Sequence, residues 1–189
     1  MIIAFSGDLG SGKSTIAKKI AEKLNIPRYY AGQFFREMAK ERGLTVIELA
    51  ELAKKDDSID KATDAKAREL AEKTDDFVIE TRTAQYFLPN SIKIYFKVSP
   101  GEGARRIFQE TQKNDFRENE DDGMKTIEEV ELSNKKRMST DIDRYKKYYN
   151  IDISDMKNYD FILDTTSLTP DEVFEKTLDY IKSDKRFKK

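Results

Sequence analysis

Residues 7–14 read Gly-Asp-Leu-Gly-Ser-Gly-Lys-Ser and fill every fixed position of the phosphate-loop pattern G-x-x-x-x-G-K-[ST]. An apolar run at 2–5 precedes this stretch, and apolar residues at helical spacing follow it over 16–24. In the order strand, loop, helix, the N–H groups of the loop and the positive end of the helix face the same anion. A glycine-rich turn that only joins a strand to a helix would not require Lys13 and Ser14. The stretch therefore predicts an α/β fold with a nucleotide-phosphate site.

The composition limits the chemistry that is available. The chain has 189 residues, a length that suits one domain, and it contains no Cys and no His. Disulfides, thiolate nucleophiles, His bases and Cys/His zinc sites are thereby excluded. Phosphoryl transfer remains possible because it depends mainly on positioning and charge stabilisation.

The charge balance and the hydropathy limit the partners. Lys and Arg total 35 against 36 for Asp and Glu, which argues against bulk binding of nucleic acid. The apolar run at 2–5 is too short for a signal peptide, and no later run approaches the roughly 20 residues of a membrane span. We expect a monomeric, cytoplasmic protein that binds small molecules and has no membrane partner.

Alternating strand and helix signals predict a parallel sheet of about five strands, covered by helices on both faces. Three helical patterns insert about forty residues between the second and third strands, more than a crossover needs, and this insertion is a candidate substrate-binding arm. Strands are expected at 2–5, 28–30, 77–79, 92–98 and 159–164, and helices at 16–24, 33–42, 45–54, 57–73, 102–112, 126–149 and from 170 onward.

Two arginines are candidate phosphate ligands. Arg36 lies in the expected arm directly after Phe34 and Phe35, a pairing that suits the phosphate and the base of a nucleotide. The alternative is a solvated arginine beside two core phenylalanines. Arg82 follows the strand at 77–79, and ligands of open α/β sheets bind at the carboxyl ends of the strands. We expect Arg82 to contact a phosphate that binds across the cleft.

Three carboxylates are candidate ligands. Glu80 ends the strand before Arg82, where phosphate-loop enzymes carry the acidic group that holds Mg²⁺ directly or through water. An ordinary charge at a strand end is the alternative. Asp60 and Asp64 are four residues apart on one helix and therefore share a face, which suits hydrogen bonds to a base or a ribose. The same two residues are also compatible with a solvated helix face.

A later helix carries Arg137, Asp141 and Arg144 at spacings of four and three, so all three lie on one side. Two arginines placed in this way can clamp phosphates as charge spreads in the transition state. An ion-paired surface helix has the same spacing. The polar, glycine-interrupted segment 113–123 lies directly upstream and predicts a hinged lid, which favours the catalytic interpretation.

Several segments together resemble archaeal-type cytidylate kinases. The resemblance covers nearly the whole chain and implies a nucleoside monophosphate kinase that moves the γ-phosphate of ATP to CMP or dCMP with Mg²⁺. Thr81 departs from the usual Gly of such families, and the segment between Arg106 and Arg137 is longer and more acidic than expected. The matching segments are the phosphate loop, Ala31-Gly32-Gln33-Phe34-Phe35-Arg36, Asp60-x-x-x-Asp64, Glu80-x-Arg82, Arg144-Tyr145-x-x-Tyr148-Tyr149-x-Ile151-Asp152-Ile153-x-Asp155 and Tyr159-Asp160.

The resemblance also implies an organisation and a set of site residues. It implies one P-loop kinase domain over 1–189, a three-layer α/β/α fold similar to adenylate kinase. The core is 1–30, 77–112 and 150–189, the monophosphate-binding arm about 31–74, and the lid with its helix about 113–149. The implied ATP ligands are Gly7, Asp8, Leu9, Gly10, Ser11, Gly12, Lys13, Ser14 and Thr15; the acceptor ligands Gly32, Phe35, Arg36, Asp60, Asp64 and Arg82; the metal ligands Ser14 and Glu80; and the catalytic cations Lys13, Arg82, Arg137 and Arg144.

Two other functions remain open from the sequence. One is a P-loop kinase for another acceptor, such as AMP, dTMP or a small metabolite. The other is a switch whose phosphate loop only senses ATP or GTP. A guanine-reading switch should contain Asn-Lys-x-Asp, but residues 134–137 read Asn-Lys-Lys-Arg and lack the acid.

Overall fold

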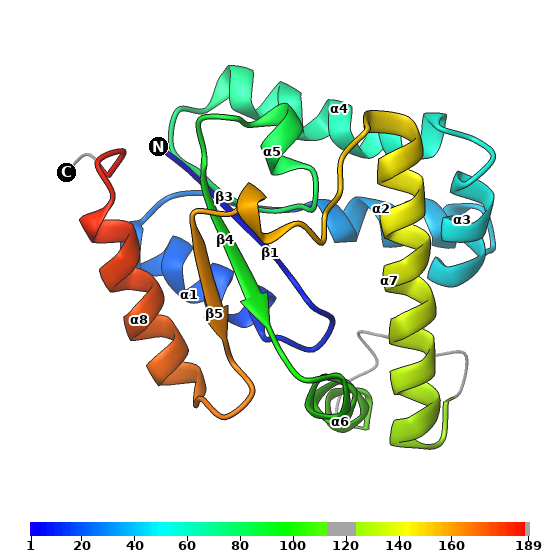
Figure 1. The fold of residues 1–189 in the computed structure, drawn as a ribbon. Helices are drawn as coiled ribbons and strands as arrows, with labels where there is room; N and C mark the ends of the chain where they lie inside the picture. Colours follow the sequence, from blue (N-terminus) through cyan, green and yellow to red (C-terminus); the bar gives the residue numbers. More distant parts are fainter. Residues whose placement is uncertain (113–123, 188–189) are drawn as a thin grey trace.

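The computed structural model describes residues 1–112 and 124–187. Within these residues, five parallel strands form one sheet in the order β2-β3-β1-β4-β5, which confirms the predicted sheet (Figure 1). The central position of β1 places the phosphate loop at the middle of the carboxyl edge, and Phe5 pairs with Glu80 on the neighbouring strand. The strands are β1 (Ile2–Gly7), β2 (Arg28–Tyr30), β3 (Phe77–Glu80), β4 (Ile92–Lys97) and β5 (Phe161–Asp164).

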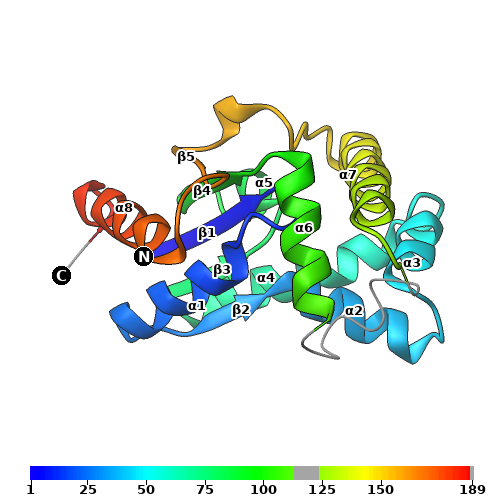
Figure 2. The same cartoon turned by 90° about the horizontal axis from the view of Figure 1, so that it is seen from below.

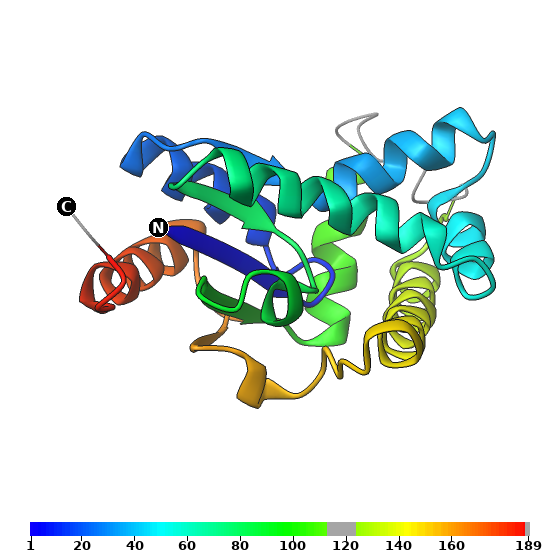
Figure 3. The same cartoon turned by 90° about the horizontal axis from the view of Figure 1, so that it is seen from above.

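Helices cover both faces of the sheet. On one face, α1 (Lys13–Leu24) and α8 (Pro170–Ser183) pack on Ile3 and Phe5 of β1 (Figure 1). On the other face, Ala4 of the same strand packs with β3 and α5 (Ala84–Phe87), a short helix that the sequence did not predict (Figure 3). Successive strand residues point to opposite faces, so one apolar run fills both cores.

The insertion between β2 and β3 consists of α2 (Ala31–Glu41), α3 (Val46–Ala53) and α4 (Ser58–Lys73). It has an apolar core of its own, formed by buried Ala39, Leu49, Ala53 and Ile59. The turn between α2 and α3 contains Gly43 at φ 65°, a conformation that favours glycine. The predicted helical insertion is therefore present, and it folds around a separate small cluster.

The helix α7 (Ile127–Tyr149) spans two parts of the molecule. Its first turns pack on α6 (Pro100–Thr111) through Val130, Ala104 and Ile107. Its last turns lie beside α3, as Figure 2 shows, and the hydroxyl of Tyr148 donates to the carbonyl of Ala53 at 2.7 Å. One helix thus joins the α6 side of the core to the inserted arm.

Several boundaries differ from the predicted ones. The helix α6 begins at Pro100 rather than at 102, because proline is favoured in the first turn of a helix. Gly103, which weakens the helical pattern, allows α6 to approach the phosphate loop: a Cβ there would lie 2.5 Å from the carbonyl oxygen of Leu9. The strand β5 begins at Phe161 rather than at 159. The segment 113–123, which the sequence predicts to be a hinged lid, lies outside the described residues.

None of the helices in the described part of the chain is both long enough and apolar enough to cross a membrane.

Candidate active site

The phosphate loop connects β1 to α1 and is held in shape by Asp8. Gly10 and Gly12 have φ angles of 79° and 82°, which favour glycine and turn the loop around the start of the helix. The carboxylate of Asp8 accepts hydrogen bonds from the Tyr95 hydroxyl at 2.6 Å and from the backbone N–H of Val98 at 3.0 Å. The variable second position of the motif therefore anchors the loop to β4 and to the chain just beyond it, a role that the motif alone did not reveal.

Ser14 and Glu80 lie together where α1 begins and β3 ends. The hydroxyl of Ser14 donates to Oε2 of Glu80 at 2.5 Å, and Arg28 donates to Oε1 of the same carboxylate. Glu80 is 2% exposed, so it is not an ordinary charge at a strand end. The two predicted metal ligands are adjacent, and the structure adds Arg28 as a cation beside them.

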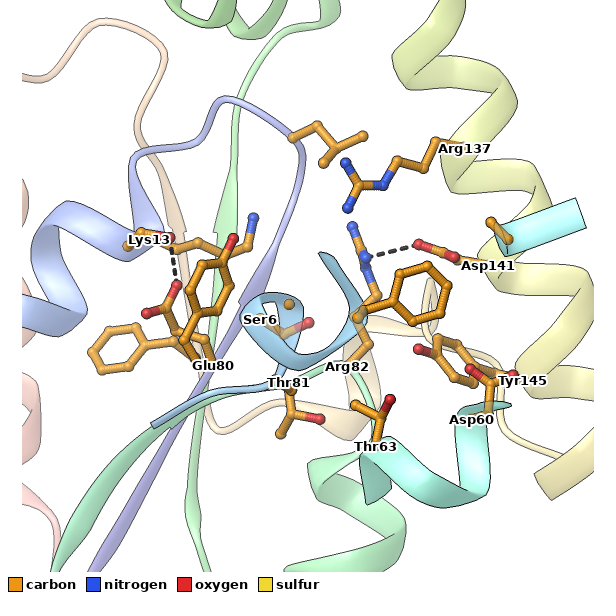
Figure 4. Close-up of a pocket in the computed structure, with 18 of the residues that line it drawn as sticks. Ser6, Lys13, Asp60, Thr63, Glu80, Thr81, Arg82, Arg137, Asp141 and Tyr145 are labelled. Atoms are coloured by element: carbon orange, nitrogen blue, oxygen red, sulfur yellow. Dashed lines mark hydrogen bonds and ion pairs between the residues drawn. The ribbon is translucent and has the colours of Figure 1, made fainter. Parts of the chain in front are cut away.

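A cavity opens between the phosphate loop, the arm and α7 (Figure 4). It brings together cations and carboxylates from segments that are far apart in the sequence. Lys13, Gly32, Phe35, Asp60, Asp64, Arg82, Arg137 and Arg144 all line it, and so do Tyr30, Glu80, Thr81, Asp141 and Tyr145, among others.

Four charged side chains, three of them buried, form a chain along the wall of this cavity. Nη1 of Arg82 donates to Oδ2 of Asp141 at 2.7 Å, and Oδ1 of Asp141 lies 3.0 Å from Nη2 of Arg144. Nε of Arg144 lies 2.7 Å from Oδ2 of Asp60. Asp60, Asp141 and Arg144 are each less than 5% exposed, so the solvated alternatives are excluded. Arg144 is consequently an interior partner of two carboxylates, and it also lines the cavity.

Asp64 belongs to a second hydrogen-bonded chain. Its carboxylate accepts from the hydroxyls of Thr83 at 2.9 Å and Tyr149 at 2.5 Å. Thr81, the residue in place of the usual Gly, shares a hydrogen bond of 2.9 Å with Thr83, and its own N–H donates to Phe5. Thr81, in place of the usual Gly, therefore preserves the strand end. Its hydroxyl also links the end of β3 to the arm through Thr83 and Asp64.

The two remaining arginines differ in position. The guanidinium of Arg137 points toward that of Arg82 across the cavity (Figure 4). Like charges that face each other in this way favour an anion between them. Arg36 does not line the cavity: its guanidinium lies 4.6 Å from the ring centre of Tyr30, which does. The structure thus brings Arg82 and Arg137 together and leaves Arg36 behind the aromatic wall.

A second cavity lies on the other side of the phosphate loop. Residues 10–16 line it together with Arg105 and Arg106 of α6 and the segment 166–170. Arg106 donates to the carbonyls of Thr165 and Thr166 at 2.8 and 3.1 Å and so connects α6 to that segment. Gly10, Lys13 and Ser14 line both cavities. The two cavities therefore meet at Lys13 and Ser14, the last two fixed positions of the motif.

Burial changes the ionisation of two carboxyl groups that line the first cavity. Burial raises the pKa of Asp60 to about 7, the Arg144 guanidinium opposes this shift, and nearby Asp64 and Asp141 add to it. The pKa of Asp64 is also raised, mainly by burial, although hydrogen bonds from Tyr149 and Thr83 oppose the shift. The wall of the cavity therefore contains one carboxyl group, that of Asp60, that can change charge near neutral pH.

A phosphate loop at the centre of a five-stranded parallel sheet, with two cavities that meet at its lysine, defines a P-loop kinase. Among solved structures, shikimate kinase from Bacteroides thetaiotaomicron superposes with a TM-score of 0.61 at 17% identity, covering 96% of each chain, and supports this fold. The model of the cytidylate kinase-like family matches residues 2–167. The chain belongs to the cytidylate kinase-like family and is an ATP-dependent phosphotransferase.

Curated relatives agree with the family assignment. The cytidylate kinase of Natronomonas pharaonis is 38% identical over 175 residues, which are 92% of this chain and 85% of that one. The cytidylate kinase of Pyrobaculum islandicum is 37% identical over 183 residues, 96% of this chain and 92% of that one. The predicted family is confirmed.

Proposed function

We propose that the protein transfers the γ-phosphate of ATP to CMP or dCMP and forms CDP or dCDP. Family membership supports this function, and one observation of the structure carries it. Two cavities meet at Lys13 and Ser14, and one of them is lined by both cations and buried carboxylates. A hydrolase or a switch needs only the phosphate-loop cavity, whereas transfer needs a second site that faces the first.

The donor site is proposed at residues 7–15 and the cavity behind them. Backbone N–H groups of the loop would surround the phosphates of ATP, and Lys13 would neutralise the charge on its terminal phosphates. Lys13 reaches the shared edge of both cavities, where its Nζ donates to the carbonyl of Asp8 at 3.2 Å. It would therefore lie between donor and acceptor.

The residues present fit Mg²⁺. Ser14 and Glu80 offer hard oxygen donors side by side, and Mg²⁺ commonly binds through one or two such groups, substrate phosphates and water. No group of three or more acidic side chains within the described residues forms a metal cage of its own, which agrees with a site completed by phosphates. When bound, the ion would neutralise the negative charge that develops on the phosphates.

The acceptor site is proposed in the cavity beside the arm. Arg82 and Arg137 would bind the acceptor phosphate and the transferring group, because their guanidinium groups converge there (Figure 4). Asp60 and Asp64 would accept hydrogen bonds from the cytosine amine or from ribose hydroxyls. Gly32 and Phe35 line the same cavity. Arg36 would support the cavity wall at Tyr30, because its guanidinium lies over that ring.

The proposed transfer needs no titrating base near the nucleophile. The acceptor oxygen belongs to a phosphate that is already ionised, so positioning and charge stabilisation supply the catalysis. Lys13, Arg82 and Arg137 would stabilise the charge that spreads over the transferring group. Arg144 would hold Asp60 and Asp141 in place from behind.

The chain is also proposed to contain an arm and a lid within one domain, the arm over about 31–74 and the lid over about 113–149. A separate core for the arm supports the first assignment. The part of the lid at 113–123 lies outside the described residues. The contact of Tyr148 with Ala53 joins the end of α7 to the arm, so the last turns of that helix would move with the acceptor site.

A coupled assay of ATP with a panel of monophosphates tests the proposal. We expect CMP and dCMP to give the highest kcat/KM among CMP, dCMP, UMP, AMP, GMP and dTMP, because two carboxylates in the cavity are suited to an amine-bearing pyrimidine. ADP formation without any acceptor measures hydrolysis and serves as the control. Preferred turnover of AMP or dTMP would identify a kinase for that acceptor, and no turnover of CMP or dCMP would exclude the proposal.

The affinity for the acceptor should depend on pH through Asp60. With its pKa at about 7, this carboxyl is mostly protonated at about pH 6 and mostly ionised at about pH 8. Only the ionised form is purely a hydrogen-bond acceptor for the cytosine amine, so KM for CMP should fall as pH rises, by up to roughly tenfold.

Steady-state kinetics of the wild type and of Asp60→Asn test this dependence. The second ionisation of CMP, with a pKa of about 6, affects both proteins equally, so the difference between the two pH profiles reports Asp60 alone. The same pH dependence in both proteins would assign the titration to another group.

A further inference from the structure

Arg28 is a cation beside the proposed metal site, and no motif predicts it. Its Nε and Nη2 both donate to Oε1 of Glu80, at 2.9 and 2.5 Å, while Oε2 accepts from Ser14. The side chain of Glu80 is 1% exposed and that of Arg28 is 27% exposed. The two oxygens of one buried carboxylate thus have separate partners, one in the sheet edge and one in the phosphate loop.

The position of Arg28 follows from the sheet. It is the first residue of β2, an edge strand that pairs with β3, and two residues later Tyr30 pairs with Glu80. The guanidinium of Arg28 lies 5.6 Å from the ring centre of Tyr30, and that of Arg36 lies 4.6 Å from the same ring. Arg28 therefore approaches Glu80 from outside the cavity, between the carboxylate and the aromatic wall of the acceptor site.

We propose that Arg28 is a positioning residue for the metal-bound nucleotide: it holds Glu80 by Oε1 and keeps Oε2 directed at Ser14 and the Mg²⁺ site. This inference rests on the proposed metal site at Ser14 and Glu80.

Physical reasons favour this role over that of an ordinary ion pair. A buried carboxylate without a compensating cation is unfavourable, and Arg28 supplies that cation when no metal is bound. Both of its donating nitrogens contact a single oxygen, so the other oxygen can bind the ion or its water without displacing the arginine. Groups that orient a metal ligand in this way commonly change metal affinity by about 10- to 100-fold when they are removed.

Binding of AMP-PNP, a non-hydrolysable ATP analogue, provides a test that needs no turnover. Calorimetry gives its dissociation constant in excess Mg²⁺ and again in EDTA, and the ratio of the two constants reports the contribution of the metal. Arg28→Gln is expected to weaken the binding of AMP-PNP in Mg²⁺ about 10-fold more than its binding in EDTA. Arg28→Lys, which keeps the charge but loses the two-nitrogen contact, should lie between Arg28→Gln and the wild type.

Arg186→Gln is the matched control. The side chain of Arg186 is 28% exposed and pairs with Asp160 and Asp184, so it has similar exposure and ionic contacts. Its partners Asp160 and Ser91 lie next to the amino ends of β5 and β4, at the edge of the sheet opposite to the phosphate loop. This control should leave the binding ratio unchanged while costing a similar amount of thermal stability.

The proposal is overturned if the ratio in Arg28→Gln equals that of the wild type, including the case in which both forms of the analogue lose affinity equally. If Arg28→Gln does not fold, the same comparison with Arg28→Lys decides, and an unchanged ratio there overturns the proposal.

In steady-state kinetics Arg28→Gln should lower kcat and leave KM for CMP unchanged. Failure of the wild type to use CMP would refute the proposed acceptor but would not affect the binding ratio.

Discussion

Lys13→Ala is expected to lower kcat/KM by about 10³-fold, because it removes the cation that lies between the two cavities. In the structure Nζ of Lys13 donates to the carbonyl of Asp8, within the loop that would surround the phosphates. The negative charge that develops on the transferring phosphoryl group would lose the nearest fixed positive charge. Most of the loss should occur in kcat, since backbone N–H groups still bind the ground-state nucleotide.

Single-turnover kinetics separate this effect from weakened binding. Lys18→Ala is the control, because Lys18 lies on the same helix but is 66% exposed and pairs only weakly with Glu22 at 3.9 Å. Its activity should equal that of the wild type. Unchanged turnover in Lys13→Ala would remove the phosphate loop from the mechanism.

Arg82→Ala is expected to lower kcat/KM for the acceptor by about 10²-fold and to leave the affinity for ATP unchanged. The guanidinium of Arg82 lies in the cavity with Nη1 on Asp141, and its Nη2 has no hydrogen-bond partner among the described residues. A buried donor in this state is suited to a phosphate oxygen. Asp141 retains Arg144 in the variant, so the fold should survive the substitution.

Separate titrations of ATP and CMP, together with kcat and both KM values, test this assignment. Arg42→Ala provides a control on the arm, since Arg42 is exposed at the end of α2 and lies outside the cavity. A selective loss of ATP affinity in Arg82→Ala would place Arg82 on the donor side instead.

The architecture was predictable because its signals are local. The structure has capping boxes at Thr45, Thr126 and Thr169, each of which joins a hydroxyl and a backbone N–H only three residues apart. The strand signals gave the parallel sheet, with β3 and β4 close to their expected bounds. The short helix α5 was missed, since four residues carry too little periodicity to be recognised.

The candidate site was predictable only in part. Glu80 and Arg82 could be placed because carboxyl ends of parallel strands share one edge of the sheet. The position of Arg36 behind Tyr30 and the burial of Arg144 between two aspartates depend on contacts between separate elements. Helical spacing identified the face that Arg137, Asp141 and Arg144 share, but it could not distinguish a surface ion pair from an interior one.

The sequence by itself determined the phosphate loop, the succession of strands and helices, and the membership of a kinase family. These features depend on neighbouring residues, through periodicity, caps and the backbone freedom of glycine. Only the tertiary structure decided which charges meet. Arg28 and Glu80 are 52 positions apart, and Arg82 and Asp141 are 59 apart. Such pairs form because the sheet order and the packing of α7 bring their elements together. No local sequence pattern indicates which distant residues will pair.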